Sequence, residues 1–288
     1  MKKNELLAAL SKMGVTPSKR FGQNFMLDGN LLKFIAKEAN VVPGDNVLEV
    51  GPGCGALTQL ILDGGANLAA VELDKRLVDY LNELLASREN FQLIQGDACK
   101  LDIATVVRDA FSKDESGIQS AQIDWKCIAN LPYSISSPFI AKLAALQNPP
   151  MKALFLLQKE TAERFAASPG TKNYGSLSVV IQLVFKVKYL RTVSPEVFFP
   201  APDVKSALVE FQRLPTSPSP EERTRISNVA RTAFSQRRKK MIKALSSKFG
   251  KEKCLETFQK LGINENARAE ELNPEAFIQL AKSLHTSF

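Results

Sequence analysis

The stretch Asn46–Thr58, "NVLEVGPGCGALT", decides the fold of this chain. Its first five residues form an apolar run of strand length, and its last residues begin a helical pattern. Between them stand Gly51, Gly53 and Gly55, which let the backbone pass close to a ligand, while the helix that follows offers unpaired N–H groups. The stretch therefore predicts a strand, a ligand-binding turn and a helix in direct succession.

The alternation of strand and helix patterns continues along the chain. Further strand-length runs are "LAAVEL" (68–73), "FQLIQ" (91–95), "WKCIAN" (125–130) and "ALFLLQ" (153–158), with helical stretches such as 57–62 and 75–86 between them. Repeated strand–helix units predict a parallel sheet covered on both faces. The last two runs, 187–193 and 206–214, are separated only by a proline-rich segment, which predicts antiparallel pairing at the end of the sheet. We expect an α/β fold of the Rossmann-like kind with a mostly parallel sheet.

A change in composition predicts a second, smaller domain. The segment 216–222, "TSPSPEE", has the hydroxyl residues and prolines of a linker. Beyond it, apolar residues recur at helical spacing through residues 223–288, which predicts a small all-helical domain. The first domain is then 1–215, with residues 1–40 as an N-terminal lid and helices.

The turn and the acids near it indicate a nucleoside ligand. A dinucleotide fingerprint has its third glycine at the sixth position, which is Ala56 here, although alanine is sometimes accepted there. Glu49 beside the turn suits a ligand with an amino group and no phosphates, which favours S-adenosylmethionine over a dinucleotide. Glu72 and Asp97 end the next two strands, where they can accept hydrogen bonds from ribose hydroxyls and an adenine amine. Each acid taken alone is more typical of a helix cap or a surface position. The prediction of a nucleoside ligand therefore rests on the three acids and the glycine turn together.

The fourth strand ends in Asn130-Leu131-Pro132-Tyr133 at the same predicted edge. Pro132 fixes its own φ and pushes Leu131 toward an extended conformation, which predicts carbonyls that no helix absorbs. An amide oxygen and a carbonyl in this place can accept both protons of an aromatic amine, while Tyr133 offers a ring for stacking. From these four residues alone, a plain turn with a packed tyrosine is equally compatible.

Composition narrows the class of chemistry. The only histidine is His285, and the four cysteines stand singly, so the sequence predicts neither histidine catalysis nor a metal site. The net charge is +8 and concentrates in residues 1–40 and 221–288, which predicts a polyanionic partner such as nucleic acid. Without a membrane-length apolar run or a signal-peptide core, the sequence favours a water-soluble, cytoplasmic protein that does not bind membranes.

Nine ordered stretches make the chain resemble the ribosomal RNA adenine dimethylase family, and within it the branch that acts on the small subunit. They are "KRFGQNFM" (19–26), "EVGPGCGALT" (49–58), "VELD" (71–74), "GDA" (96–98), "NLPYSISSP" (130–138), "LLQKE" (156–160), "YGSLSV" (174–179), "FFPAPDVKSA" (198–207) and "AFSQRRK" (233–239). The resemblance implies a class I methyltransferase fold and transfer of methyl groups from S-adenosylmethionine to N6 of two adjacent adenines near the 3′ end of 16S rRNA. It further implies a monomer that acts on a pre-30S particle during small-subunit biogenesis.

The resemblance also assigns roles to residues. The cofactor contacts it implies are Gln23, Asn24, Met26, Gly51, Gly53, Glu72, Asp97 and Asn130. Around the target adenine it implies Asn130, Leu131, Pro132 and Tyr133, with Phe198 facing Tyr133 across the base. The basic residues Lys19, Arg20, Arg237, Arg238, Lys239 and Lys240 are the predicted RNA contacts.

Departures from the family pattern are modest, and three alternatives stay open. Met26 replaces the usual leucine, Ala201 interrupts a triple proline, and Asp203 stands where a lysine is common. The alternatives are a macrolide-resistance enzyme that methylates large-subunit RNA, a non-catalytic RNA-binding assembly factor, and an NAD-dependent dehydrogenase. The second proline of "NLPYSISSP" argues against the large-subunit enzyme, and the intact acids argue against a non-catalytic factor. The position of the only histidine argues against a dehydrogenase.

Overall fold

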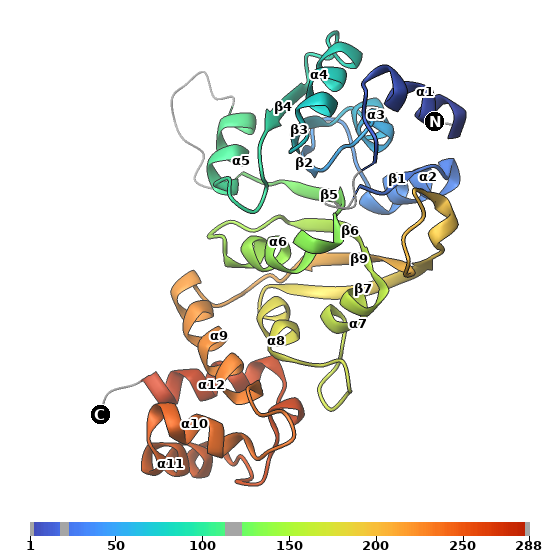
Figure 1. Ribbon diagram of the computed structural model, residues 1–288. Coiled ribbons are helices and arrows are strands. Elements are labelled where there is room, and N and C mark those ends of the chain that lie inside the picture. Colours follow the sequence, from blue (N-terminus) through green and yellow to red (C-terminus); the bar gives the residue numbers. More distant parts are fainter. Residues whose placement is uncertain (1–2, 18–22, 113–122, 286–288) are drawn as a thin grey trace. The chain divides into compact units, whose positions relative to one another are not determined.

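The computed structural model describes residues 3–17, 23–112 and 123–285. The chain divides into two compact units (Figure 1). Unit 1 comprises Met1–Leu143, Pro150–Lys159 and Lys188–Gln212, and unit 2 comprises Ala144–Pro149, Glu160–Val187 and Arg213–Phe288. The segments 144–149 and 160–187, which the sequence placed within domain 1–215, thus belong to the unit that contains the C-terminal helices.

Unit 1 is built on a seven-stranded sheet with the order β4-β3-β2-β5-β6-β9-β7. The strands are β2 (Asn46–Val50), β3 (Asn67–Glu72), β4 (Phe91–Gln95), β5 (Lys126–Asn130), β6 (Lys152–Gln158), β7 (Phe185–Val193) and β9 (Ser206–Arg213). β2 pairs in parallel with β3 on one side and with β5 on the other, and β9 runs antiparallel to β6. The mixed sheet that we predicted is confirmed, and the antiparallel strand lies second from the edge, inside β7.

The order of the strands creates a crevice. From β2 the chain passes outward through β3 to β4 and then returns to the other side of β2 as β5. In open α/β sheets, ligands bind beyond the carboxyl ends of the strands at this kind of reversal. Val50, Glu72 and Asn130, at the ends of β2, β3 and β5, therefore mark the expected binding edge.

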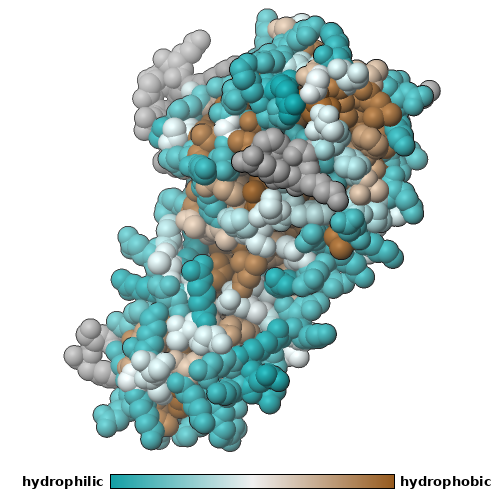
Figure 2. Space-filling model, viewed as in Figure 1, coloured by the Kyte–Doolittle hydropathy of each residue, from teal (hydrophilic) through white to brown (hydrophobic). Residues whose placement is uncertain are grey.

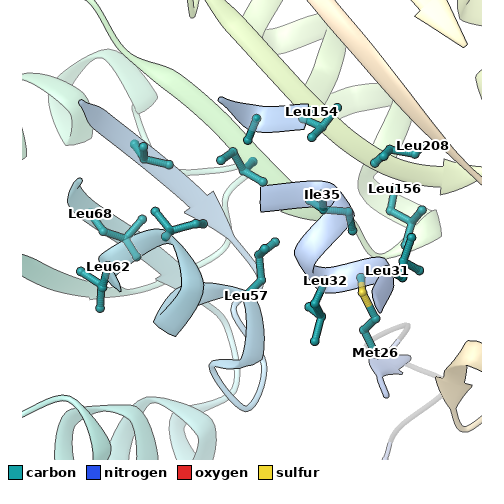
Figure 3. Close-up of a cluster of buried hydrophobic side chains, with 14 of the residues drawn as sticks. Met26, Leu31, Leu32, Ile35, Leu57, Leu62, Leu68, Leu154, Leu156 and Leu208 are labelled. Atoms are coloured by element: carbon teal, nitrogen blue, oxygen red, sulfur yellow. The ribbon is translucent and has the colours of Figure 1, made fainter. Parts of the chain in front are cut away.

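Helices α2 (Gly29–Ala39), α3 (Ala56–Asp63), α4 (Lys75–Leu84), α5 (Ile103–Phe111) and α6 (Tyr133–Ala145) follow or precede these strands. α2 and α3 pack with the sheet in one buried apolar cluster, which includes Leu31, Ile35, Leu57, Leu154 and Leu208 (Figure 3). β2 is buried on both faces, because Val47 and Leu48 are both fully inaccessible. This explains why its sequence is a continuous apolar run instead of an alternating one.

A two-stranded ribbon joins distant parts of unit 1. β1 (Phe25–Met26) pairs antiparallel with β8 (Phe198–Phe199), which follows the 3-10 turn η2 (Pro195–Val197). The N-terminal helix α1 (Lys3–Lys12) packs Leu6 and Leu10 in a second apolar cluster with Phe25 and Leu77.

Unit 2 contains α7 (Lys159–Phe165), α8 (Ser176–Gln182), α9 (Pro220–Phe234), α10 (Met241–Phe249), α11 (Lys251–Leu261), η3 (Ala269–Glu271) and α12 (Pro274–His285). The connection before α9 is shorter than the predicted linker 216–222, because α9 begins at Pro220. Ser219 caps this helix by accepting from the Glu222 N–H, and Glu222 accepts in return from the Ser219 N–H. The serine, proline and glutamate that suggested a linker are therefore a capping box with proline in the first turn.

Candidate active site

A pocket lies at the carboxyl ends of β2, β3 and β5 and holds about 810 Å³ of empty space. Its lining includes seven of the eight predicted cofactor residues, namely Gln23, Asn24, Met26, Gly51, Gly53, Glu72 and Asn130. Leu131, Pro132 and Tyr133 line it as well. The structure thus brings most of the predicted site together, although the role of each residue in binding stays a prediction.

The glycine turn is tightly packed at Gly53. Gly53 has a φ of 58°, and a β-carbon there would stand 3.2 Å from the Phe25 ring. Its N–H donates to Glu72 Oε2 at 3.3 Å. The turn is therefore fixed both to the β1 segment and to the acid at the end of β3.

Glu72 is held by backbone donors. Its Oε1 accepts from the N–H groups of Leu73 and Asp74 at 2.8 and 2.9 Å. Burial raises the pKa of this carboxyl, and the backbone hydrogen bonds oppose that shift. The carboxylate is thus oriented before any ligand arrives, which suits recognition of a ribose diol.

Glu49 carries the clearest sign of a missing partner. Its side chain is 2% exposed and lines the pocket, and Oε2 has no hydrogen-bond partner among the described residues. Burial raises its pKa from 4.5 to about 8. Thr58 beside the carboxyl opposes this shift, so the oxygen that a ligand could complete is Oε2, which is costly to bury without a partner. Sequence reasoning used Glu49 to choose the ligand and missed it as a binding residue.

The charges of the pocket test whether S-adenosylmethionine fits. The described lining residues include two carboxylates, Glu49 and Glu72, and no lysine or arginine. Such a wall favours a ligand with ammonium and sulfonium groups and disfavours a pyrophosphate. The residues present therefore fit S-adenosylmethionine, and they do not fit the dinucleotide of the dehydrogenase alternative.

Asn130 is oriented by the β1 segment. Its Nδ2 donates to the backbone carbonyl of Asn24 at 2.8 Å. This bond sets the orientation of the amide and therefore the position of its oxygen, Oδ1. That oxygen is left as an acceptor at the pocket.

The carbonyls that follow Asn130 differ from our expectation. α6 begins at Tyr133, directly after the proline, so the Pro132 carbonyl accepts from the Ile135 N–H and the Ser136 hydroxyl at 3.0 and 3.1 Å. The Leu131 carbonyl accepts none of the described backbone hydrogen bonds. Only one of the carbonyls that the proline was predicted to hold outward is thus left for a ligand.

Tyr133 is anchored through its hydroxyl. The Tyr133 oxygen and Ser206 Oγ lie 2.7 Å apart, and Ser206 is fully buried at the start of β9. Burial raises the pKa of the Tyr133 phenol, so the ring stays neutral at physiological pH. Sequence reasoning missed Ser206, because only the pairing of β9 beside β6 brings it to Tyr133.

The predicted contact of Phe198 with Tyr133 across the target base stays a prediction. The Phe198 side chain is 3% exposed, lies in the same apolar cluster as Leu31 and Leu57, and is absent from the pocket lining. The physical reason is the β1–β8 ribbon, where Phe198 pairs with Met26 and successive side chains point to opposite faces.

Asp97 lies just outside the pocket, one strand away from Glu72. The Gly96 N–H donates to the Glu72 carbonyl at 2.9 Å, and Asp97 Oδ1 accepts from the Cys99 N–H at 2.9 Å. Leu73, next to Glu72, is 49% exposed. An exposed leucine directly after Glu72 is a candidate surface for a flat base, and sequence reasoning missed it.

None of the predicted RNA contacts is among the described residues that line this pocket. Lys19 and Arg20 fall outside the described residues. Arg238, Lys239 and Lys240 are exposed in the turn between α9 and α10, and hydrophilic residues dominate the face of unit 2 shown in Figure 2. Arg237 is already engaged, because its Nε donates to Glu270 at 2.9 Å and its Nη2 to the Thr171 carbonyl at 3.2 Å.

Two findings bear on alternative sites. Within the described ranges no group of three or more histidine, cysteine or carboxylate side chains is placed to hold a metal ion. None of the helices between residues 3 and 285 has the length and apolar character needed to cross a membrane.

The strand order and the acidic pocket at its reversal define a Rossmann-like methyltransferase. The family model for ribosomal RNA adenine dimethylase matches residues 15–286. The chain is 40% identical to ribosomal RNA small subunit methyltransferase A of Pseudomonas syringae, over 92% of this chain and 94% of that protein. It is 36% identical to the protein of that name in Moorella thermoacetica, over 96% of each. Among solved structures, a dimethyladenosine transferase from Plasmodium falciparum matches with a TM-score of 0.73 and 25% identity, over 89% of this chain and 95% of that one. The chain belongs to the ribosomal RNA adenine dimethylase family.

Proposed function

We propose that this chain transfers methyl groups from S-adenosylmethionine to N6 of two adjacent adenines near the 3′ end of 16S rRNA, giving N6,N6-dimethyladenosine. It would act as a cytoplasmic monomer on a pre-30S particle during small-subunit biogenesis. The observation that carries the proposal is the oriented amide of Asn130 beside the Leu131 carbonyl, at an acidic pocket in a chain of this family. The names of the small-subunit relatives support the choice of RNA.

The cofactor contacts follow from the lining of the pocket. The Glu49 carboxylate would accept from the ammonium of the methionine part, and Gln23, Asn24, Met26, Gly51 and Gly53 would surround the rest of that part. Glu72 would accept from the ribose hydroxyls, and Asp97 from the exocyclic amine of the cofactor's adenine. When bound, S-adenosylmethionine supplies an electrophilic methyl group on a positively charged sulfur.

The residues at the end of β5 would make the target amine reactive. The lone pair of an adenine amine is delocalised into the ring, which makes it a poor nucleophile. Asn130 Oδ1 and the Leu131 carbonyl would each accept one N–H proton, which makes the nitrogen more tetrahedral and aims its lone pair at the methyl carbon. The N–C bond forms as the C–S bond breaks, the sulfur keeps the electron pair, and the amine then loses a proton to water. The chain needs no histidine for this chemistry.

The target base has to leave its stack before it reaches these acceptors. Extrusion costs a few kcal/mol, and stacking on an aromatic ring returns roughly 1 to 3 kcal/mol. Tyr133 is an aromatic residue of the pocket that follows the acceptors directly, and its bond to Ser206 would hold it ready for the base. The exposed Arg238, Lys239 and Lys240 would bind RNA phosphates and position the substrate.

One experiment tests the proposal. Undermethylated small subunits and, separately, large-subunit RNA are incubated with labelled S-adenosylmethionine and either the wild type or Asn130→Ala. Label in small-subunit adenines that the variant fails to introduce supports the proposal. Label in large-subunit RNA would favour the macrolide-resistance alternative, and RNA binding without transfer would favour the assembly factor.

A further inference from the structure

Lys142 joins the helix that begins at Tyr133 to the loop that carries Asp97. It lies in the last turn of α6, and its ammonium donates to the backbone carbonyls of Ala98, Cys99 and Leu101, at 3.3 Å and 2.9 Å for the first two. Three converging carbonyls satisfy all three donors of an ammonium group. Lys142 is partly buried, and all three of its N–H donors bond to this one short loop. These bonds fix the position of the loop.

The loop in question is a compact turn organised around Asp97. The Asp97 carbonyl accepts from the N–H groups of Lys100 and Leu101 at 2.8 and 2.9 Å, while Oδ1 accepts from the Cys99 N–H. A β-carbon at Gly96 would meet Cδ1 of Leu101 at 2.8 Å, so a side chain there would displace the Leu101 side chain. These bonds turn the carbonyls of residues 98, 99 and 101 toward α6, where Lys142 neutralises their partial charges.

The same bonds leave one oxygen of Asp97 for a ligand. Among the described residues, the one polar contact of Oδ2 is a long one of 3.8 Å with Lys100, whose side chain is 85% exposed, so that ion pair is weak. The direction of Oδ2 is thus set by the turn, and the turn is set by Lys142.

We propose that Lys142 is a positioning residue for adenine recognition, which acts by holding the Asp97 turn in place for the exocyclic amine of the cofactor. This rests on the role proposed above for Asp97. It adds a residue on the catalytic helix that determines base selectivity for the cofactor without touching the cofactor.

The test compares two ligands that differ at this amine. S-Adenosylhomocysteine offers the amine to Asp97, whereas S-inosylhomocysteine places a carbonyl oxygen there, which repels a carboxylate. The wild type should prefer the adenosyl ligand on the order of tenfold to a hundredfold, as expected for a charged acceptor left without its donor. Both dissociation constants are measured by calorimetry on the full-length chain.

The variants separate positioning from simple stability. Lys142→Met should lower the adenosyl preference at least about fivefold, and Lys142→Arg should keep most of it. Lys126→Met is the matched control, because the Lys126 ammonium also clamps a backbone carbonyl, that of Asn40, and pairs with Asp45 at the opposite end of β5. It should lower the melting temperature without changing the ratio of the two constants.

Asp97→Asn keeps the oxygen that accepts from Cys99 and removes the charge. It should reduce the preference, and adding Lys142→Met to it should change the ratio no further. If Asp97→Asn leaves the ratio unchanged, the proposed role of Asp97 fails. If Asp97→Asn lowers the ratio while Lys142→Met keeps the wild-type value, Lys142 is not a positioning residue and the role of Asp97 stands.

A second measurement applies even if Lys142→Met folds poorly. In Lys142→Gln, amide hydrogen exchange should rise in the peptide that contains Lys100 and Leu101, because their N–H groups bond within the turn. Exchange in this peptide that equals the wild-type rate would overturn the proposal. In activity assays, the KM for S-adenosylmethionine should rise while kcat stays within about twofold, since Lys142 contacts neither Asn130 nor Tyr133.

Discussion

The side-chain amide of Asn130 donates to the backbone carbonyl of Asn24 at 2.8 Å, across more than one hundred positions of sequence. This bond connects the segment before β1 to the residue that we propose as the acceptor for the target amine. It also decides which end of the amide faces a target base, because the nitrogen is already used.

Asn130→Asp should therefore lose activity although it is nearly isosteric. The carboxylate has no donor for the Asn24 carbonyl and places a negative charge beside it. We expect kcat to fall on the order of a hundredfold to a thousandfold, as when one preorganised transition-state contact is lost. Dissociation constants for S-adenosylhomocysteine should change only a few fold. An aspartate variant with wild-type kcat would contradict the orienting role of Asn24.

Glu49 should make the free energy of unfolding depend on pH. Its pKa in the folded protein is about 8, above the ordinary 4.5, so the folded state binds more protons than the unfolded state between these values. The contribution of Glu49 thus lowers stability as pH rises from about 4.5 to about 8. Denaturant titrations should show a steeper decline for the wild type than for Glu49→Gln. Parallel curves would contradict the raised pKa.

The same carboxyl should link cofactor binding to proton release. Glu49 must ionise before it can pair with an ammonium, so binding of S-adenosylhomocysteine near pH 7 should release up to one proton from it. Calorimetry in buffers of different ionisation enthalpy measures this number. Glu49→Gln, which cannot ionise, is the control and should release less.

Tyr133 and Ser206 should behave as one unit in target binding. Tyr133→Phe keeps the ring and loses the hydroxyl, and Ser206→Ala removes the partner at 2.7 Å. Each should lower kcat/KM for the RNA several fold, and the double variant should be no worse than either one. Additive losses in this cycle would show that the bond does not position the ring.

Variants of Phe198 test whether its ring packs in the core or stacks on the target base. Because it is 3% exposed in the core, Phe198→Ala should cost about 3 to 5 kcal/mol of unfolding free energy. Phe198→Leu should retain most stability and most activity at a temperature where it is folded. A leucine variant that is fully folded but unable to methylate would instead support the predicted contact with the target base.

Neighbouring arginines should differ in how they affect RNA binding. Charge reversal at Arg237 and Arg238 together should weaken binding and reduce the salt slope, with cofactor affinity unchanged. Singly, Arg238→Ala should lower the slope by about one unit, whereas Arg237→Ala should lower it less, because Arg237 is paired with Glu270. Equal slopes for the wild type and the double reversal would contradict an RNA contact at this turn.

The features that the sequence predicted are local or periodic. The turn after β2 carries its own glycines, and Glu72 and Asn130 end apolar runs whose length identifies them as strands. Because parallel strands share an edge, the position of these residues follows without knowledge of tertiary contacts.

The features that the sequence did not predict depend on distant pairings. β1 and β8 have two residues each, too few for a periodic pattern, so neither the burial of Phe198 nor the bond from Asn24 to Asn130 was visible. Ser206 reaches Tyr133 only through the order of the strands. α7 and α8 join unit 2 through tertiary packing, which no change in composition marks.

The β1–β8 ribbon has a consequence for how the protein is made. Residues 25 and 26 form a wall of the cofactor pocket, yet their strand partners are residues 198 and 199. Domains tend to fold from the N-terminus while the chain is still being synthesised. The early strands of the sheet can pair as they emerge, but the wall at Phe25 and Met26 has to wait for more than two thirds of the chain. A nascent chain can therefore pair β2 to β6 well before it acquires the wall that β1 and β8 form.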